Sequence, residues 1–550
     1  MDRKPLIGVC SCMLLLGSII LPISSALSSE ETSRFVTQGD ILYVGGVGPN
    51  NYTKIQDAIN NASDGDTVFV YDDSSPYFEN IIIDKSVSLI GENRNTTLLW
   101  GNNQTEDTIL LQAENVMITQ ITVRAENLTH VIHVEEENAR LLGNTFINGL
   151  GIGFLNFGEN SIIENNLFFN CPLMILGAAN IIIRGNMMEN RDGCIGILFA
   201  TSCTVENNII TGGGLSIVEL FGESFKIIHN TIRWNDSSYV PSHTGLNLVN
   251  CYNSIVQDNQ LTNCGILLKN RPGGEITNNY VNGKPFVYLH NTKNTVIDDA
   301  GQVHAVDCRD ITIRNLTISN VTQGITLYNV RNSLIKDNTI SECSECIYGT
   351  FFYCAFENNT FDSCEMGMMC RGKQNDIRKN RFINCSTFGI FTSATEEIQN
   401  NTFTLCFTGV CLARGLCASN RIENCSIGIR CSGWSAIRVT SNSIRFCGTG
   451  IVAGDSGSIS RQTSELSTDK ILSMPRLFRR EISYNNIINT SVDASFMNAI
   501  FTHWIGNYWG EPYEKPKIIH GYLKYDPYWG PRIEWINVDW RPAKEPYDIN

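Results

Sequence analysis

The sequence predicts an all-β fold, a parallel β-helix built as a solenoid of coils about 21 residues long. Three observations support this prediction. A six-residue phrase recurs with cysteine at its end, as in NTISEC, NTFDSC, NRFINC, NTFTLC, NRIENC and NSIRFC. Apolar residues within each repeat alternate with period two, and no 3.6-residue periodicity occurs. Such a repeat is too short for two helices, but three short strands with Asn, Gly and Ser turns fill it.

An asparagine marks each repeat within a pattern of the form apolar-x-x-Asn-x-apolar. Most gaps between marked asparagines are 19 to 23 residues, and longer gaps precede Asn259, Asn315 and Asn486. Stacked coils place equivalent residues about 4.8 Å apart. We therefore expect these asparagines to adopt left-handed turn geometry and to bond to one another as a side-chain ladder. The marked residues are Asn144, Asn166, Asn186, Asn208, Asn230, Asn259, Asn279, Asn315, Asn338, Asn359, Asn380, Asn401, Asn420, Asn442 and Asn486.

The 20 cysteines allow three interpretations. Disulfides suit an exported protein, but stacked Cβ atoms stay about 4.8 Å apart, beyond the roughly 3.5–4.5 Å that a disulfide needs. A copper or zinc site has soft ligands available, notably in Met366-Gly-Met368-Met369-Cys370, but the sequence shows no matched CxxC pairs and no paired histidines at ligand spacing. We favour the third interpretation, in which most cysteines are free, buried thiols that fill one corner of the interior.

The N-terminus begins with a basic MDRK, continues through a mostly apolar run to Ile23 and ends in small residues. This order predicts a secretory signal peptide over residues 1–28, with cleavage near Ala26 or Ser28. An uncleaved N-terminal membrane anchor is the alternative, and no later segment is apolar enough to span a bilayer. Residues 37–66 are predicted to form a strand and a capping helix that buries Ile55, Ala58 and Ile59.

The β-helix is predicted over residues 67–490, with a Ser-rich loop extruded at 454–480. Residues 491–550 are rich in Trp, Tyr and Pro and lack a strand pattern, which favours a C-terminal cap over the open end of the solenoid. The alternative is a glycan-binding aromatic surface, because aromatic rings stack on sugar faces. Its candidate residues are Trp504, Trp509, Tyr528 and Trp529.

The segment YTKIQDAINNASDGDTVFVYDDSSPYFENIIIDKSVSLIGE resembles the opening of pectin-lyase-like right-handed β-helix proteins. The coils GITLYNVRNSLIKDNTI and GIFTSATEEIQNNTF resemble the NosD-like group, also called carbohydrate-binding and sugar-hydrolase (CASH) repeats. The resemblance covers about residues 41–490. It implies a right-handed solenoid in an exported archaeal or bacterial protein of the surface or periplasm. Some relatives bind, cleave or epimerise polysaccharides, and the name-giving member helps to mature a copper enzyme, but no copper motif is carried over.

The sequence shows none of the catalytic signatures of polygalacturonases, alginate epimerases or pectin methylesterases. One group of acids lies in a long gap of the repeat and is the low-ranked catalytic candidate, with turn carboxylates as the favoured interpretation. Its residues are Asp298, Asp299, His304, Asp307 and Asp310. A second acidic run is read as a solvated edge rather than a weak calcium site. It comprises His133, Glu135, Glu136 and Glu137.

The formal net charge of −14, with only 17 % charged residues, excludes a nucleic-acid partner, which would require a basic surface. The leading hypothesis is a non-catalytic polysaccharide-binding or cell-envelope protein, and the composition suits neutral glycans better than polyuronates. The first alternative is a polysaccharide lyase, hydrolase or epimerase with a non-standard site. The second is a periplasmic accessory protein of a copper enzyme. No cofactor is expected, and calcium is an option that no motif supports.

Overall fold

The computed structural model describes twelve stretches of the chain. They are residues 39–103, 105–126, 129–155, 158–190, 193–212, 218–235, 244–269, 274–432, 436–454, 480–499, 502–524 and 532–549. The predicted signal peptide lies outside these stretches, as does nearly all of the predicted loop at 454–480.

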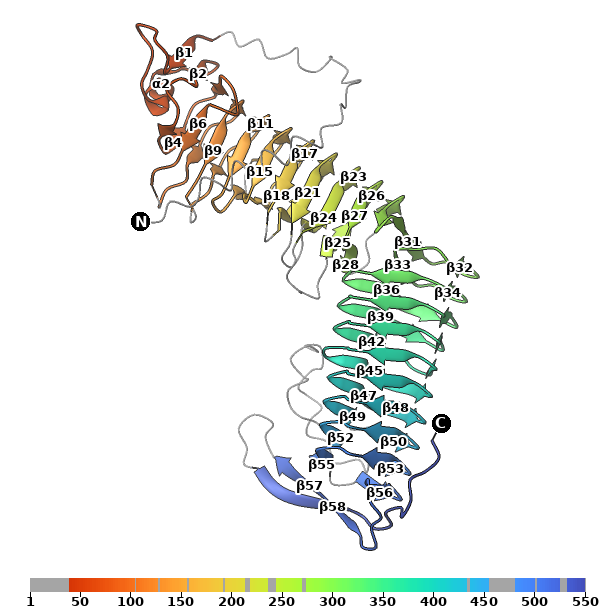
Figure 1. Cartoon of the computed structure of the whole chain (residues 1–550). Helices are drawn as coiled ribbons and strands as arrows, with labels where there is room; N and C mark the ends of the chain where they lie inside the picture. Colours follow the sequence, from red (N-terminus) through yellow and green to blue (C-terminus); the bar gives the residue numbers. More distant parts are fainter. Residues whose placement is uncertain are drawn as a thin grey trace.

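Short parallel strands stack coil upon coil into a β-helix, as the sequence predicts. The β-helix has two arms, a first arm over residues 41–281 and a second arm over residues 284–539. In the first arm three columns of strands run side by side (Figure 1). The columns extend from β1 (Ile41–Val44) to β29 (Gly274–Thr277), from β3 (Tyr77–Phe78) to β30 (Tyr280–Val281) and from β4 (Ile81–Ile83) to β28 (Gly265–Lys269). In the second arm they extend from β31 (Lys284–His290) to β57 (Lys517–Lys524), from β32 (Val296–Ile297) to β58 (Arg532–Asp539) and from β35 (Thr317–Ser319) to β54 (Asn486–Ile488).

The two arms meet at a bend between β28 and β33 (Gln302–Val306), seen in the middle of Figure 1. Here the parallel stacking is interrupted, because β30 and β31 pair antiparallel through the turn Asn282-Gly283. The side-chain amide of Gln302 spans the junction. It donates to the carbonyl oxygens of Ile266 (2.7 Å) and Gln323 (2.9 Å) and accepts from the backbone N–H of Ile266 (2.9 Å).

The interior is filled by the central residue of many three-residue strands. In β46 (Thr402–Thr404), for example, Phe403 is fully buried between two partly buried threonines. Equivalent residues of successive coils stack, and the rings of Phe361, Phe382 and Phe403 lie 4.8 and 4.7 Å apart between centroids. Period-two alternation therefore places one apolar side chain of each short strand in a continuous core.

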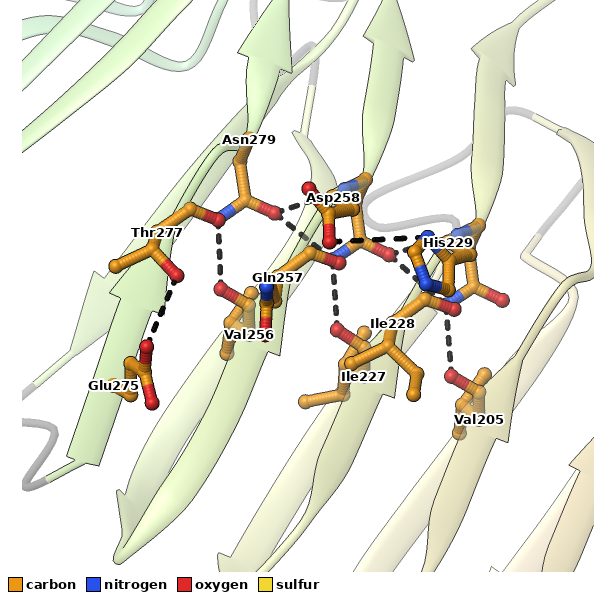
Figure 2. A network of polar contacts seen from close by, with 12 residues as sticks. Val205, Ile227, Ile228, His229, Val256, Gln257, Asp258, Glu275, Thr277 and Asn279 are labelled. Carbon is orange, nitrogen blue, oxygen red and sulfur yellow. Dashed lines mark hydrogen bonds and ion pairs between the residues drawn. The ribbon is translucent and has the colours of Figure 1, made fainter.

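The asparagine ladder is present, and its asparagines bond to backbone groups as well as to one another. The backbone N–H and the amide of Asn166 both donate to Oδ1 of Asn186, at 2.9 and 3.1 Å, and the amide also donates to the carbonyl oxygen of Leu141. Figure 2 shows another part of the ladder, where Asn279 donates to the carbonyl oxygen of Val256. Each amide thus satisfies backbone groups that burial would otherwise leave unpaired.

The left-handed turn residue is the neighbour of the ladder asparagine, which corrects the sequence prediction. Asn165 has a φ of 57°, whereas Asn166 carries the ladder contacts. The one-residue offset also corrects two marked positions. Asn315 is an exposed turn residue with Leu316 at the ladder position, and Asn485 replaces Asn486 in the ladder. The ladder therefore runs from Asn144 to Asn279 and resumes at Asn338, with its gap at the bend.

Most cysteines are free and buried, as predicted. Of the 18 cysteines in the described residues, 16 are free and buried, and Cys346 and Cys364 form a disulfide. The disulfide does not join two stacked phrase-ending cysteines, because Cys346 lies in β39 (Glu345–Phe352), outside the phrase. The thiols therefore act mainly as small apolar side chains.

Both ends of the solenoid are covered. At the N-terminal end, α2 (Ile55–Asn61) buries Ile55, Ala58 and Ile59, the face expected from the sequence. At the C-terminal end, β57 and β58 form an antiparallel hairpin. The buried carboxylate of Asp539 accepts from Asn507, the last ladder asparagine, through the backbone N–H (3.0 Å) and the amide (3.2 Å). A carboxylate thus ends the ladder, and the described residues beyond it form no further coil.

Candidate functional site

The acids of the catalytic candidate group contact different side chains. The exposed Asp298 lies 3.4 Å from Arg314, and Asp299 lies 4.0 Å from Lys284. Asp307 and Asp310 are turn residues, with φ of 53° and 54°. Their position at coil corners follows the favoured interpretation as turn carboxylates.

The predicted aromatic surface at the C-terminus is divided by the fold. Trp504 and Trp509 lie in the core, with 1 % and 3 % exposed, and Nε1 of Trp509 donates to Asp539 (3.2 Å). Buried rings have no face open to a sugar. Tyr528 and Trp529 lie outside the described residues. Among the described residues of the C-terminal segment, the rings of Trp535 and Trp540 are exposed.

A different set of side chains is gathered on strands next to the bend. The ring centroid of His304 on β33 lies 5.8 Å from that of Tyr288 on β31 and 5.5 Å from that of Tyr328 on β36 (Gln323–Arg331). The ring of Tyr348 on β39 lies 6.1 Å from Tyr328. Val303 and Ala305 point into the core, so His304 and its partners occupy the opposite face of the sheet.

His304 is the buried base of this group. It is 2 % exposed, and its Nε2 has no hydrogen-bond partner among the described residues. Burial lowers its pKa to about 3, so the imidazole is neutral across the physiological pH range. His304 therefore packs beneath the tyrosines and is closed to solvent.

Glu345 is the titratable group of the same face. Its pKa is raised to about 7, chiefly by burial and in part by the charge of Glu365. A hydrogen bond from Gln323 (3.3 Å) and the charges of Lys269 and Arg371 act in the opposite direction. A carboxyl group with this pKa exchanges its proton near neutral pH, which is a property of catalytic acids and bases.

Arg371 supplies an exposed cation beside the tyrosines. Its guanidinium lies 5.9 Å from the ring centroid of Tyr348. Burial raises the pKa of Tyr328, and Tyr348 and Glu345 add to this effect. Both tyrosine and carboxyl groups can thus donate hydrogen bonds at neutral pH. We call Tyr288, Tyr328, Glu345, Tyr348 and Arg371 the tyrosine face.

The tyrosine face combines flat rings, hydrogen-bond donors, one carboxyl group near its pKa and one cation. Rings and donors are suited to binding sugars, and a cation is suited to an anionic substituent. The sequence did not predict this face, because the candidate residues were taken from the acids of an irregular coil. A signal was available in the repeat itself, since Gln323 and Glu345 are 22 residues apart and occupy equivalent positions on adjacent coils.

The predicted acidic edge is a mixed polar cluster. Glu135 accepts from Gln112 (2.8 Å), and His133 lies with His130 around Asp107. The sequence interpretation that no paired histidines occur at ligand spacing is therefore wrong. The sequence pattern that could have indicated this cluster is His-x-x-His at residues 130–133, with Asp107 one coil earlier.

Comparisons with known proteins place the chain among β-helix proteins. Residues 159–295 and 223–352 match the profile of the periplasmic copper-binding protein NosD, and residues 289–427 match that of the right-handed β-helix region. No curated protein shows a significant sequence match.

Solved structures with a similar backbone include the tailspike gp61 of Pseudomonas phage phi297, at 9% identity over 86% of this chain and 78% of that one, with a TM-score of 0.28. The A-module of the Azotobacter vinelandii mannuronan C-5 epimerase AlgE6 is 11% identical over 71% and 94%, with a TM-score of 0.23. The PL6 family alginate lyase AlyGC is 9% identical over 86% and 97%, with a TM-score of 0.22. We draw no functional conclusion from these distant similarities.

The described residues of the NosD-matched segment do not fit a copper site. Among them, no three His, Cys, Asp or Glu side chains lie close enough to share an ion. The described cysteines there are buried, so their thiols are closed to an ion from solvent. Within the described ranges, no helix has the length and apolarity needed to cross a bilayer.

Proposed function

Because the chain is a NosD-like right-handed parallel β-helix protein, we propose that it is an exported polysaccharide-binding protein of the cell surface or periplasm, and that the tyrosine face binds the glycan. The observation that carries this proposal is the row of rings Tyr288, Tyr328 and Tyr348, joined beneath by the buried ring of His304, with Arg371 beside Tyr348. Coils repeat about every 4.8 Å, so an extended chain of sugars that binds to the face makes several successive contacts with it. Several weak contacts together give useful affinity.

The charges of the tyrosine face favour a neutral polysaccharide. Arg371 and Lys269 are balanced by Glu345 and Glu365, since the charges of Arg371, Lys269 and Glu365 all act on the carboxyl group of Glu345. The chain as a whole carries a formal net charge of −14, which repels a polyuronate. A neutral glycan meets the rings without this repulsion.

The test is a binding assay with the chain lacking residues 1–28, against neutral glycans and polyuronates, with and without calcium. We expect a neutral glycan to bind and the variant Arg371→Gln to bind at least about tenfold more weakly, because a shorter amide with fewer N–H donors replaces the planar guanidinium beside the rings. The matched control is Arg378→Gln, which removes an exposed arginine paired with Glu357 and Asp376. Absence of binding to any glycan, or equal losses in both variants, would contradict the proposal.

A second candidate function is a lyase or epimerase reaction on a uronate, and the pKa of Glu345 near 7 favours it. Removing the proton beside a uronate carboxylate requires a base, an acid and neutralisation of the carboxylate. Glu345, a tyrosine hydroxyl and Arg371 are the groups of the face that match these roles.

Mass spectrometry of polyuronates incubated with the protein in D₂O distinguishes this function from binding alone, because a lyase product is unsaturated and an epimerised residue takes up solvent deuterium. Catalysis would give unsaturated or epimerised products in the wild type and none with Glu345→Gln. Products that persist in Glu345→Gln would exclude Glu345 as the base, and unchanged substrate would leave the protein a binding module.

A further inference from the structure

Two histidines and one aspartate converge on the first arm, outside the residues that match NosD and away from the tyrosine face. Asp107 precedes β7 (Ile109–Leu111), and His130 precedes β10 (Ile132–Val134), which contains His133. Ile109 and Ile132 are partners across the two strands. Residue 107 of one coil therefore lies beside residue 130 of the next, and His133 faces the same side three residues later.

The three side chains contact one another through their potential ligand atoms. Oδ1 of Asp107 lies 3.0 Å from Nδ1 of His130, and Oδ2 lies 3.0 Å from Nδ1 of His133. The backbone N–H of His130 also donates to Oδ1 (2.8 Å), which fixes the carboxylate. The three ligand atoms all lie within 4.8 Å of one another. Both imidazoles thus direct the same nitrogen toward one carboxylate.

The two distances between a histidine nitrogen and a carboxylate oxygen are close to what a shared ion requires. Zinc binds histidine nitrogen and carboxylate oxygen at about 2.0–2.2 Å, so two such ligands on one ion are separated by about 3.0–3.5 Å. The other nitrogen of His130 faces Gly153, where a Cβ would approach Nε2 to 3.4 Å. Nδ1 is therefore the atom of His130 that is directed toward the centre of the cluster.

We propose that Asp107, His130 and His133 bind a divalent transition-metal ion such as Zn²⁺. Two imidazoles favour such an ion over Ca²⁺ and Mg²⁺, which prefer oxygen ligands, and the absence of thiolate or thioether among the three disfavours Cu⁺. The side chains of the three residues are 20–26 % exposed. Water therefore reaches the ion and fills the position that three protein ligands leave open.

The ion would link two consecutive coils. Asp107 belongs to one coil and the two histidines to the next, so binding stabilises the stacking of the first arm. The site does not depend on the glycan proposed above, since it shares no residue with the tyrosine face.

The experiment measures Zn²⁺ binding to the untagged chain lacking residues 1–28, by calorimetry and by competition with a chromophoric chelator. We expect one Zn²⁺ per chain, a melting temperature raised by several degrees, and little heat with Ca²⁺. His133→Asn and Asp107→Asn are expected to weaken binding at least tenfold. The control is His229→Asn, which removes an exposed histidine 3.9 Å from Asp258 and should leave binding unchanged.

Three results would overturn the proposal. They are no Zn²⁺ binding by the wild type, undiminished binding by both cluster variants, or comparable binding of Ca²⁺. The first result would identify the cluster as a hydrogen-bonded network only. If the variants fail to fold, X-ray absorption at the zinc edge of the wild type decides the question. Two imidazoles and oxygen ligands are expected, and sulfur ligands would contradict the assignment.

Discussion

At the scale of single residues, Glu396 is a carboxyl group buried inside the second arm. It is 1 % exposed, its Oε1 accepts from the thiol of Cys370 (3.1 Å), and its Oε2 accepts from the backbone N–H of Asn375 (2.9 Å). Burial raises its pKa from 4.5 to about 7, against the hydrogen bonds from Cys370 and Asn375. The folded protein therefore holds this proton more tightly than the unfolded chain does.

This shift predicts that stability falls as the pH rises. The contribution of Glu396 is fully present below pH 4.5 and is lost as the pH passes through about 7, because the buried group must then carry a charge. Each pKa unit corresponds to about 1.4 kcal/mol, so the loss is about 3 kcal/mol. Glu396→Gln stays neutral and should lose most of this dependence, as measured by thermal unfolding at pH 5, 6.5 and 8.

The neighbouring, exposed Glu397 provides the control for this measurement. Glu397→Gln should retain the wild-type dependence on pH. A smaller residual slope is expected in Glu396→Gln, since burial also raises the pKa of Glu345 to about 7. An identical slope in wild type and Glu396→Gln would refute the assignment.

The candidate functional residues were largely unpredictable from the sequence, for a physical reason. A site on a solenoid is assembled from positions one coil apart, and the chemistry of each position depends on burial by its neighbours. In the sequence, Glu345 resembles any other acid beside a turn. Its raised pKa follows from its burial in the folded protein, which the sequence does not show. His304 was named in the sequence and is buried, but its partners are rings and not the nearby aspartates.

At the scale of the elements, the asparagine ladder joins each turn to the next. The amide of Asn380 donates to the carbonyl oxygen of Phe356 (2.9 Å) and to Oδ1 of Asn401 (3.0 Å), while its Oδ1 accepts from Asn359. The sequence predicted the ladder from its period. It did not separate the ladder residue from the left-handed residue before it, because both are frequently asparagine and only backbone angles distinguish them.

Replacing one ladder amide by a carboxylate tests this role. In Asn380→Asp the donors are lost, and a buried negative charge faces carbonyl oxygens, so we expect a loss of about 3 kcal/mol or more. The control is Asn384→Asp, an exposed residue at φ 52° where Asp is well tolerated. Urea unfolding followed by circular dichroism compares the two variants, and equal stabilities would show that the ladder amides contribute little.

At the scale of the whole molecule, the bend is the place where the regular repeat stops. The ladder is interrupted there, and the amide of Gln302 joins the arms through Ile266 and Gln323. The sequence indicated this region only as long gaps in the spacing of the asparagines. A gap in a repeat shows where coils change, but the direction of the chain after it depends on contacts between residues far apart in sequence.

Removing this amide should loosen the bend and leave distant coils intact. Gln302→Ala unpairs two carbonyl oxygens and one N–H, so amide hydrogen exchange in β28 and β33 should become at least tenfold faster. Coils from β46 onward should be unchanged, because a solenoid coil contacts only its neighbours. Gln260→Ala, at an exposed position of β27 (Gln260–Thr262), is the control. Uniform acceleration along the chain would contradict this expectation.

The ladder also has an evolutionary consequence. Every internal ladder asparagine offers its side-chain oxygen as acceptor to the asparagine of the coil before it, and donates from its backbone N–H and amide to the asparagine of the coil after it. A duplication or deletion of one coil's length of gene would therefore leave each new neighbour with a matching partner. We therefore expect the number of coils in each arm to vary between relatives. The bend and Asp539 have no equivalent in the other coils, so we expect both to be retained.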